Sequence, residues 1–249
     1  MVYRMCDGGN EPALLFIHGA VGDSRLFRHQ LRFFGKKYRT LAVDLPGHGR
    51  SNVSLVPNLG HFVDAVERIC MEERIGRVIL IGHSMGGGVS FELYQRGVLN
   101  ICGIVLVSTA PVLPVPDEMY RMAEEDNVVR FSDILINSVF SRKTGLLMEL
   151  ARKGMSDFNM PMVRNDMLLC NNMDYSDTLG SITVPVLIIA NSGDRVIPAE
   201  ETVSMGERIP GARIVVFDSE GHVPFYENDD DFNAALDAFC DAMPGAVTS

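Results

Sequence analysis

Residues 78–88 read Val78-Ile79-Leu80-Ile81-Gly82-His83-Ser84-Met85-Gly86-Gly87-Gly88. The four aliphatic residues at the start predict a buried strand, and the pattern after Ser84 predicts a helix. A Gly-x-Ser-x-Gly sequence between a strand and a helix is typical of a nucleophilic serine at the apex of a sharp, strained turn. Gly82 and Gly86 let strand and helix pass closely, because neither carries a Cβ atom. We therefore expect Ser84 to be a nucleophile; the alternative is a glycine-rich turn in another α/β sheet.

Short aliphatic runs recur on both sides of this stretch, separated by amphipathic patterns. They predict seven strands, at residues 2–6, 14–17, 40–43, 78–81, 104–107, 186–189 and 214–217. Helices are predicted from Asp23 or Ser24 to Gly35, near 59–73, after Ser84, near 199–208 and from Asp229 onward. Strands that alternate with helices imply a largely parallel sheet covered on both faces. The predicted fold class is therefore α/β.

Residues 111–177 interrupt this alternation. They contain no strand-like run, show short helical periods, and are too long for a plain connection. Of the 14 methionines in the chain, eight fall here, namely Met119, Met122, Met148, Met155, Met160, Met162, Met167 and Met173. We expect a core domain formed by residues 1–110 and 178–249, with residues 111–177 inserted as a helical lid. A lid rich in flexible methionine side chains favours a deformable apolar wall over the site, although the same residues could simply pack the lid onto the sheet.

Polar residues follow the predicted strand ends, and in a parallel sheet those ends meet at one edge. Ser84, Asp194 and His222 occur in the chain order nucleophile, acid, histidine. A serine hydroxyl needs a base within hydrogen-bond reach, and His222 is the candidate. The imidazole needs a carboxylate to fix its tautomer, and Asp194 is the candidate. The alternatives are that Asp194 caps the following helix and that His222 is a surface turn residue.

The attacked carbonyl develops negative charge, which backbone N–H groups can receive. We expect the N–H of Met85, after the nucleophile, and of Ala20, after His18-Gly19, to form this oxyanion hole. Other polar residues near the predicted site are assigned structural roles, namely His18, Asp44 and His48 within their own loops and His83 in at most a supporting role.

These motifs form an ordered set: His18-Gly19, Asp44-x-Pro46-Gly47-His48-Gly49-x-Ser51, Gly82-His83-Ser84-Met85-Gly86-Gly87, Gly193-Asp194-x-x-x-Pro198 and Gly221-His222-x-Pro224. The chain resembles the α/β-hydrolase fold superfamily, in its lidded serine esterase and lactonase group. The resemblance implies a mostly parallel sheet of about seven strands with a helical lid. It also implies Ser84, Asp194 and His222 as the catalytic triad, and no cofactor.

The chain departs from that family at three places. Relatives usually begin with a two-stranded hairpin, whereas only about a dozen residues precede the first His-Gly strand here, so the N-terminus of the sheet is expected to be shortened. Many relatives carry a bulky residue where this chain has Ala20. Relatives that cleave carbon–carbon bonds often carry Trp after the catalytic histidine, where this chain has Val223 and no Trp at all.

The predicted activity is hydrolysis of a carboxylic ester, thioester or lactone of a small to medium, largely apolar substrate through an acyl-enzyme. Ser84 argues against dehalogenases and epoxide hydrolases of this fold, which use an aspartate nucleophile. The first alternative is a carbon–carbon bond hydrolase of the same fold. The second belongs to another class, a non-catalytic ligand-binding protein on this fold.

Composition limits the partners. A net charge of -10 argues against nucleic acid and anionic membranes. The N-terminus has no apolar signal segment, and no run is long enough to span a bilayer. Five scattered cysteines without a C-x-x-C pair predict reduced thiols in a cytoplasmic protein, and neither cysteines nor histidines show metal-site spacing. The expected partner is a small-molecule ester, and the oligomeric state is left open.

Overall fold

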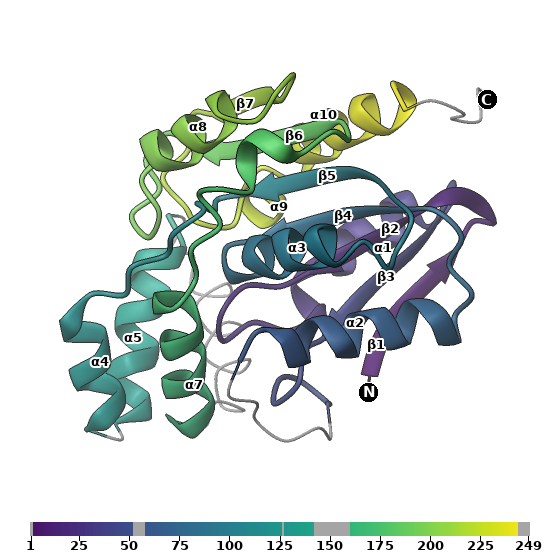
Figure 1. Cartoon of the computed structure of the whole chain (residues 1–249). Helices are drawn as coiled ribbons and strands as arrows, with labels where there is room; N and C mark the ends of the chain where they lie inside the picture. Colours follow the sequence, from purple (N-terminus) through teal and green to yellow (C-terminus); the bar gives the residue numbers. More distant parts are fainter. Residues whose placement is uncertain (1, 52–57, 126, 142–159, 244–249) are drawn as a thin grey trace.

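A seven-stranded sheet forms the centre of the computed structural model, which describes residues 2–51, 58–125, 127–141 and 160–243 (Figure 1). The strands are β1 (Val2–Asp7), β2 (Asn10–Ile17), β3 (Tyr38–Asp44), β4 (Val78–His83), β5 (Ile101–Val107), β6 (Val186–Asn191) and β7 (Arg213–Phe217), in the order β1-β3-β2-β4-β5-β6-β7. Only β1 runs antiparallel to its neighbour within this sheet. The mostly parallel sheet of seven strands is confirmed, with a single strand before β2 in the described residues.

The central strand β4 shows why such runs are uniformly aliphatic. It lies between β2 and β5, with Leu80 opposite Leu15 on one side and Ile104 on the other. Ile79 and Ile81 pack into the core on one face of the sheet, and Leu80 packs into the core on the opposite face. Both faces of β4 are buried, so the side chains that point to either face are apolar.

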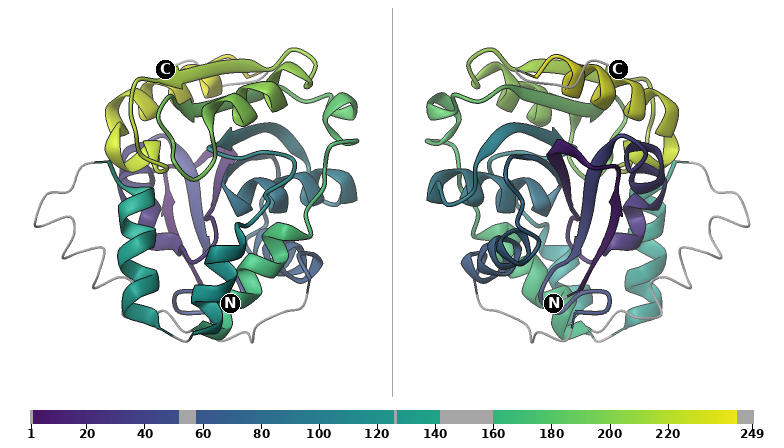
Figure 2. Two further views of the ribbon diagram at one scale, coloured as in Figure 1. Left: turned by 90° about the vertical axis from the view of Figure 1, so that its left-hand side faces the viewer. Right: turned by 90° about the vertical axis from the view of Figure 1, so that its right-hand side faces the viewer.

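Helices cover both faces of the twisted sheet (Figure 2). On one face lie α2 (Gly60–Glu72), α3 (Met85–Arg96) and α8 (Ala199–Glu207), packed through apolar side chains onto the strands. On the other lie η1 (Ser24–Phe27), α1 (Arg28–Phe34), α9 (Pro224–Glu227) and α10 (Asp229–Asp241). The helix predicted from Asp23 or Ser24 begins as a 3-10 turn, and the Asp23 carboxylate caps it by accepting from the Arg25 N–H.

The segment after β5 carries α4 (Asp117–Glu124), α5 (Val128–Val139) and α7 (Met160–Asn171), which lie together at one end of the sheet (Figure 1, lower left). Its two ends meet, because Val112 bridges Asp174 and the Tyr175 N–H donates to the Pro111 carbonyl at 3.0 Å. The short 3-10 helix η2 (Leu179–Ser181) leads from it toward β6. The division into a core and a lid domain stays a prediction.

The three helices share an apolar cluster of their own, referred to below as the lid cluster. It contains Met122, Ala123, Phe131, Met160, Met162, Val163 and Met167, all buried. Met173 instead packs with the sheet core, and Met148 and Met155 lie outside the described residues. Most of the described lid methionines therefore fill a packed interior.

All five cysteines are free, and burial raises the thiol pKa of Cys70 and of Cys240 to about 12. Within the described ranges, none of the helices has the length and apolar character needed to cross a bilayer. The cytoplasmic location stays a prediction.

Candidate active site

Ser84 sits at a strained turn between β4 and α3. Its φ of 52° and ψ of -121° lie where residues with a Cβ atom are rarely found. A Cβ atom on Gly82 would come within 2.4 Å of the Gly86 carbonyl oxygen, and one on Gly86 within 2.3 Å of the Ile17 carbonyl oxygen. The glycines therefore let α3 start directly against the ends of β4 and β2. The Thr109 hydroxyl completes the turn by donating to the Ser84 carbonyl at 2.8 Å.

Asp194 and His222 meet at the same end of the sheet, three residues after β6 and five after β7. The Nδ1 atom of His222 donates to Oδ2 of Asp194 at 2.7 Å, and both side chains are almost fully buried. The other carboxylate oxygen of Asp194 accepts from the N–H groups of Val196 at 2.8 Å and Ile197 at 3.1 Å. These bonds fix the carboxylate, and the carboxylate fixes the imidazole with Nε2 left to face a substrate or a nucleophile.

The loop carrying His222 is held next to Ser84 by its backbone. His83, directly before Ser84, donates from Nε2 to the His222 carbonyl at 2.9 Å, and the two imidazole rings lie 4.7 Å apart. The His222 N–H donates to the Val139 carbonyl at the end of α5 at 2.8 Å, and Asn191 donates to the Gly221 carbonyl. Burial lowers the pKa of His83 well below its usual value. A neutral His83 with its proton on Nε2 agrees with that bond.

Ser84 and His222 are brought to one corner without a direct bond between their side chains. Across the described residues, the Ser84 hydroxyl has no hydrogen-bond partner, and the residue is half-buried. Catalytic hydrogen bonds are often long in ligand-free structures and tighten when substrate binds. The serine hydroxyl is thus available on a turn whose backbone is rigidly held.

The loop after β2 lies over the serine turn. A Cβ atom added to Gly19 would lie 2.9 Å from the Ser84 Cβ atom and 3.0 Å from His83 Nδ1. Ala20 follows Gly19, and Met85 is the first residue of α3, where N–H groups have no partner within the helix. Neither N–H has an acceptor in the part of the chain that the structure describes. Both are therefore free to receive a developing negative charge, which leaves their role as an oxyanion hole a prediction.

The histidines and the carboxylate of the neighbouring loops bond beyond their own loops as well as within them. His18 accepts from the Leu45 N–H at 3.1 Å and donates to the Gly19 carbonyl at 2.8 Å, so it shapes two loops. Burial, together with the charge of His48, lowers its pKa to about 4. Asp44 accepts from the N–H groups of Ser24 and Arg50, so it bonds beyond its own loop.

His48 was expected to bond only within its own loop, and that expectation is incomplete. Its Nδ1 atom faces the Pro46 carbonyl at 3.0 Å, as expected, but its Nε2 atom lies 2.7 Å from Oδ2 of Asp166 on α7. Both side chains are fully buried. Sequence reasoning missed Asp166, because a lone aspartate in a helical period of the insertion carries no motif.

Sequence reasoning also missed the contacts of three other residues. Glu227 accepts from the N–H and the hydroxyl of Ser141, and it packs so closely on Gly221 that a Cβ there would lie 1.4 Å from its carboxylate. Thr109 and Asn191 support the turn and the histidine loop. Thr109 and Asn191 lie at strand ends, which is the one signal that was present. Among the described residues, no group of three or more His, Cys, Asp or Glu side chains is placed to hold a metal ion.

Known proteins share this architecture. A pimeloyl-(acyl-carrier protein) methyl ester esterase of Nitrosomonas europaea is 24% identical over 247 residues, covering 92% of this chain and 96% of that protein. A 2-hydroxy-6-oxononadienedioate/2-hydroxy-6-oxononatrienedioate hydrolase of Cupriavidus pinatubonensis is 28% identical over 252 residues, covering 91% and 86%. The solved structure of an enol-lactonase from Burkholderia xenovorans LB400 superposes with a TM-score of 0.88 at 21% identity, covering 96% and 95%.

A family model described as the alpha/beta hydrolase fold matches residues 12–229. That range contains most of β2, all of β3 to β7, and the residues Ser84, Asp194 and His222. The relatives of this family named above are hydrolases. Because the match covers most of the chain and agrees with the observed sheet, the chain belongs to the α/β-hydrolase fold family.

Proposed function

We propose that this chain is a serine hydrolase that cleaves a carboxylic ester, a thioester or a lactone through an acyl-enzyme. Ser84 is the nucleophile, His222 is the general base and acid, and Asp194 orients the imidazole. The N–H groups of Ala20 and Met85 receive the oxyanion. The substrate is of small to medium size and largely apolar.

One observation carries this proposal: the buried 2.7 Å bond between His222 Nδ1 and Asp194 Oδ2, beside a serine on a strained turn. The two residues are 28 positions apart in the sequence, so their contact is made by the tertiary fold and not by a local turn. A carboxylate that is already fixed by two backbone N–H groups keeps the imidazole in one tautomer, with its second nitrogen free to take a proton. A helix cap or a surface turn does not need this arrangement.

The chemistry follows from these positions. His222 takes the Ser84 hydroxyl proton at Nε2 while the serine oxygen attacks the substrate carbonyl carbon. The carbonyl oxygen gains negative charge, which the Ala20 and Met85 N–H groups stabilise. The imidazolium then gives its proton to the leaving alcohol or thiol, and the acyl group stays on Ser84. Water then attacks the acyl-enzyme while His222 takes its proton. His222 returns this proton to the Ser84 oxygen as the acid leaves.

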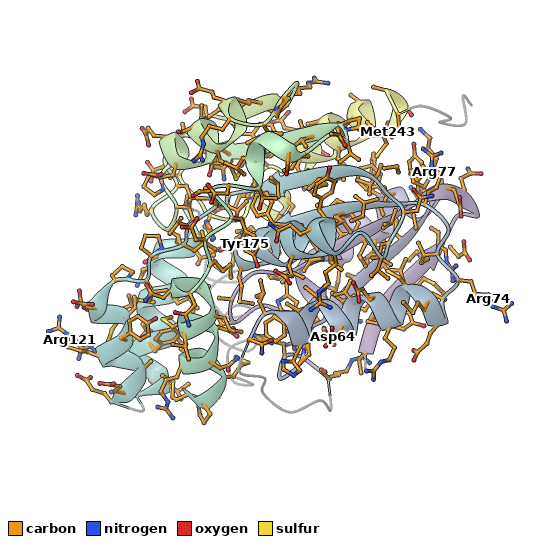
Figure 3. The ribbon with its side chains drawn as sticks, viewed as in Figure 1. Asp64, Arg74, Arg77, Arg121, Tyr175 and Met243 are labelled. Carbon is orange, nitrogen blue, oxygen red and sulfur yellow. The ribbon has the colours of Figure 1, made fainter. Side chains whose placement is uncertain are left out.

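An apolar substrate is supported by the position of the lid cluster. Val21, adjacent to Ala20, packs against that cluster, so apolar lid side chains reach the loop that flanks Ser84. Among the described basic residues of the insertion, Arg164 donates to the Ala123 carbonyl on α4 at 2.7 Å. Arg130 pairs with Glu125, and Arg121 projects outward from α4, away from the sheet (Figure 3).

The test is a series of p-nitrophenyl esters with increasing acyl length. Each methylene that enters an apolar pocket should raise kcat/KM by at most ~0.8 kcal/mol, or about fourfold, until the pocket is full. Ser84→Ala should lower kcat by roughly 10⁴-fold or more and abolish labelling by a fluorophosphonate. Ser204→Ala, an exposed serine on α8, is the matched control and should keep wild-type turnover.

A Ser84→Ala variant that keeps a tenth of wild-type turnover would exclude Ser84 as the nucleophile. Wild-type protein that resists the fluorophosphonate and hydrolyses no ester would favour a ligand-binding role instead. A steady decline from the acetate ester onward would refute the apolar pocket while leaving the hydrolase proposal intact.

A carbon–carbon bond hydrolase is the second candidate. The relative from Cupriavidus pinatubonensis, whose name describes a hydrolase of oxo-dienedioates, is the observation that favours it. Val223 follows His222 and is buried in the sheet core, so the tryptophan of many such relatives has no counterpart here. Rapid-quench detection of an acylated Ser84 with a simple ester supports the ester hydrolase. Turnover of a vinylogous diketone in the absence of ester turnover supports the alternative.

A further inference from the structure

The buried pair of His48 and Asp166 joins the loop after β3 to α7 in the insertion. The two residues are 118 positions apart, their side chains have no exposed surface, and His48 Nε2 lies 2.7 Å from Asp166 Oδ2. An ionised carboxylate is costly to bury unless it is paired and hydrogen-bonded. This pair is not used by the triad chemistry, so its placement next to the site needs its own account.

Both ring nitrogens of His48 face oxygen atoms that accept hydrogen bonds. Nδ1 faces the Pro46 carbonyl at 3.0 Å and Nε2 faces the Asp166 carboxylate. An imidazole that donates at both positions carries two protons and a positive charge. Burial acts to lower the pKa of His48, but the charge and the hydrogen bond of Asp166 outweigh it and raise that pKa. His48 therefore pairs with the buried Asp166 carboxyl group inside the protein.

The same oxygen of Asp166 makes a second bond, to the loop that flanks Ser84. Oδ2 accepts from the Val21 N–H at 2.7 Å, across 145 positions of sequence. Val21 has a φ of 53°, and a β-branched residue adopts this left-handed conformation only under constraint. A short bond to an ionised acceptor is among the stronger hydrogen bonds in proteins. Asp166 is thus the group that holds the strained Val21 backbone in place.

We propose that Asp166 is a positioning residue, which sets the oxyanion hole from the lid by fixing the Ala20–Val21 peptide through the Val21 N–H. The inference rests on the proposed function, because it takes Ala20 as an oxyanion donor. Ala20 and Val21 share a peptide plane, so a bond that fixes the Val21 N–H also fixes the Ala20 carbonyl and Cα atom, and the Ala20 N–H lies in the next peptide plane, joined at that Cα atom. The loop lies directly on Ser84 at Gly19, so a small rotation there moves the Ala20 N–H relative to the reacting carbonyl.

The predicted signature is a loss in kcat with KM nearly unchanged, since an oxyanion donor acts on the transition state. Removal of an oxyanion donor costs about 10²–10³-fold, so its misplacement should cost about 10- to 100-fold. Asp166→Ala should show this loss. Asp166→Asn, which keeps an oxygen that can accept from the Val21 N–H at the same place, should recover kcat to within about threefold of wild type.

Two further variants keep the test decisive. Asp166→Glu keeps a carboxylate as the partner of His48, so this variant serves as the test if Asp166→Ala does not fold. It displaces the carboxylate by one methylene, and it should therefore lose kcat as Asp166→Ala does. Tyr120→Phe is the matched control, because the Tyr120 hydroxyl donates to the Met167 carbonyl on the next residue of α7 without touching the loop. It should leave kcat and KM unchanged.

The experiment measures kcat and KM for a p-nitrophenyl ester, with the inhibition constant of a trifluoromethyl ketone that forms a tetrahedral adduct on the serine. In Asp166→Ala and Asp166→Glu, the inhibition constant should rise in proportion to the fall in kcat/KM. Wild-type kcat in both variants, or a loss confined to KM, overturns the inference, and so does an unchanged inhibition constant beside a lowered kcat. If Ser84→Ala also retains activity, the proposed function itself has failed; if only the Asp166 variants behave like Tyr120→Phe, the failure is of this inference alone.

Discussion

Replacing Ser84 with glycine should make the folded protein more stable than replacing it with alanine. Both substitutions remove the hydroxyl, so both variants should be inactive under the proposed function. They differ in the Cβ atom, which alanine keeps and glycine lacks. At φ 52° and ψ -121°, that atom is the source of the backbone strain, and glycine adopts this region freely.

The magnitude follows from two opposing terms. A non-glycine residue held in a sparsely populated backbone region costs about 1–3 kcal/mol. Glycine costs about 0.5–1 kcal/mol relative to alanine, because its unfolded chain has more freedom to lose. The balance favours Ser84→Gly over Ser84→Ala by about 1 kcal/mol, or roughly 2–4 °C in Tm for a chain of this length. Ser204, exposed within α8, is the control: there Ser→Ala should be the more stable variant by about 1 kcal/mol.

Urea denaturation followed by circular dichroism provides the free energy of unfolding for all four variants. The expected result is an opposite sign of the glycine-minus-alanine difference at the two sites. If alanine is the more stable replacement at Ser84 as well, the turn stores no strain, and the structural reason for placing a serine there is wrong. Fluorophosphonate labelling of the wild type, run beside the variants, confirms that the protein under study is the active form.

Two further predictions concern the same corner of the fold. Gly86→Ala should lower the free energy of unfolding by about 1–3 kcal/mol, because its Cβ would lie 2.3 Å from the Ile17 carbonyl oxygen. The control is Gly180→Ala, whose Cβ meets no atom within 4 Å and which should change that free energy by less than ~0.5 kcal/mol. Equal effects of the two substitutions in thermal denaturation would contradict the packing argument. His18 should also make the free energy of unfolding fall on acidification, because its pKa of about 4 in the folded protein lies below the value of about 6.5 in an unfolded chain. The contribution is present above pH 6.5 and is lost as the pH falls toward 4, so wild type should lose about 2–3 kcal/mol more than His18→Gln between pH 7 and 4.5, and parallel losses in urea titrations would refute it.

The sheet was predictable because burial on two faces leaves a plain signature. Runs such as Val78–Ile81 are short, aliphatic and bounded by glycine or charged residues, and no amphipathic helix has that pattern. The boundaries of the strands were harder to predict: β5 begins at Ile101 and not at Ile104. Its first residues are half-buried, and the chain there alternates less clearly, so hydrogen bonding to neighbours sets the boundary.

The proximity of Asp194 and His222 was predictable because it depends on the topology of the sheet. Asp194 and His222 follow strand ends, and strand ends of a parallel sheet converge, so their 2.7 Å contact agrees with a prediction made from topology alone. Asp166 had no such signal. It lies within α7 of the insertion, whose packing onto the core depends on the whole three-dimensional arrangement. The prediction for His48 was incomplete for the same reason, since its partner Asp166 belongs to no sequence motif.

Two of the contacts that sequence reasoning missed share a feature that explains why. His222 is held through its N–H by the Val139 carbonyl, and Val21 is held through its N–H by Asp166, so on the site side both bonds are made by the backbone. Every residue except proline supplies an N–H, and every residue supplies a carbonyl, so such bonds leave no preferred residue type behind. Both bonds also come from helices of the insertion, α5 and α7. The insertion therefore holds the backbone of the loop that carries His222 and of the loop after β2, and under the proposed function a change in its packing is expected to alter turnover even when no substrate contact is lost.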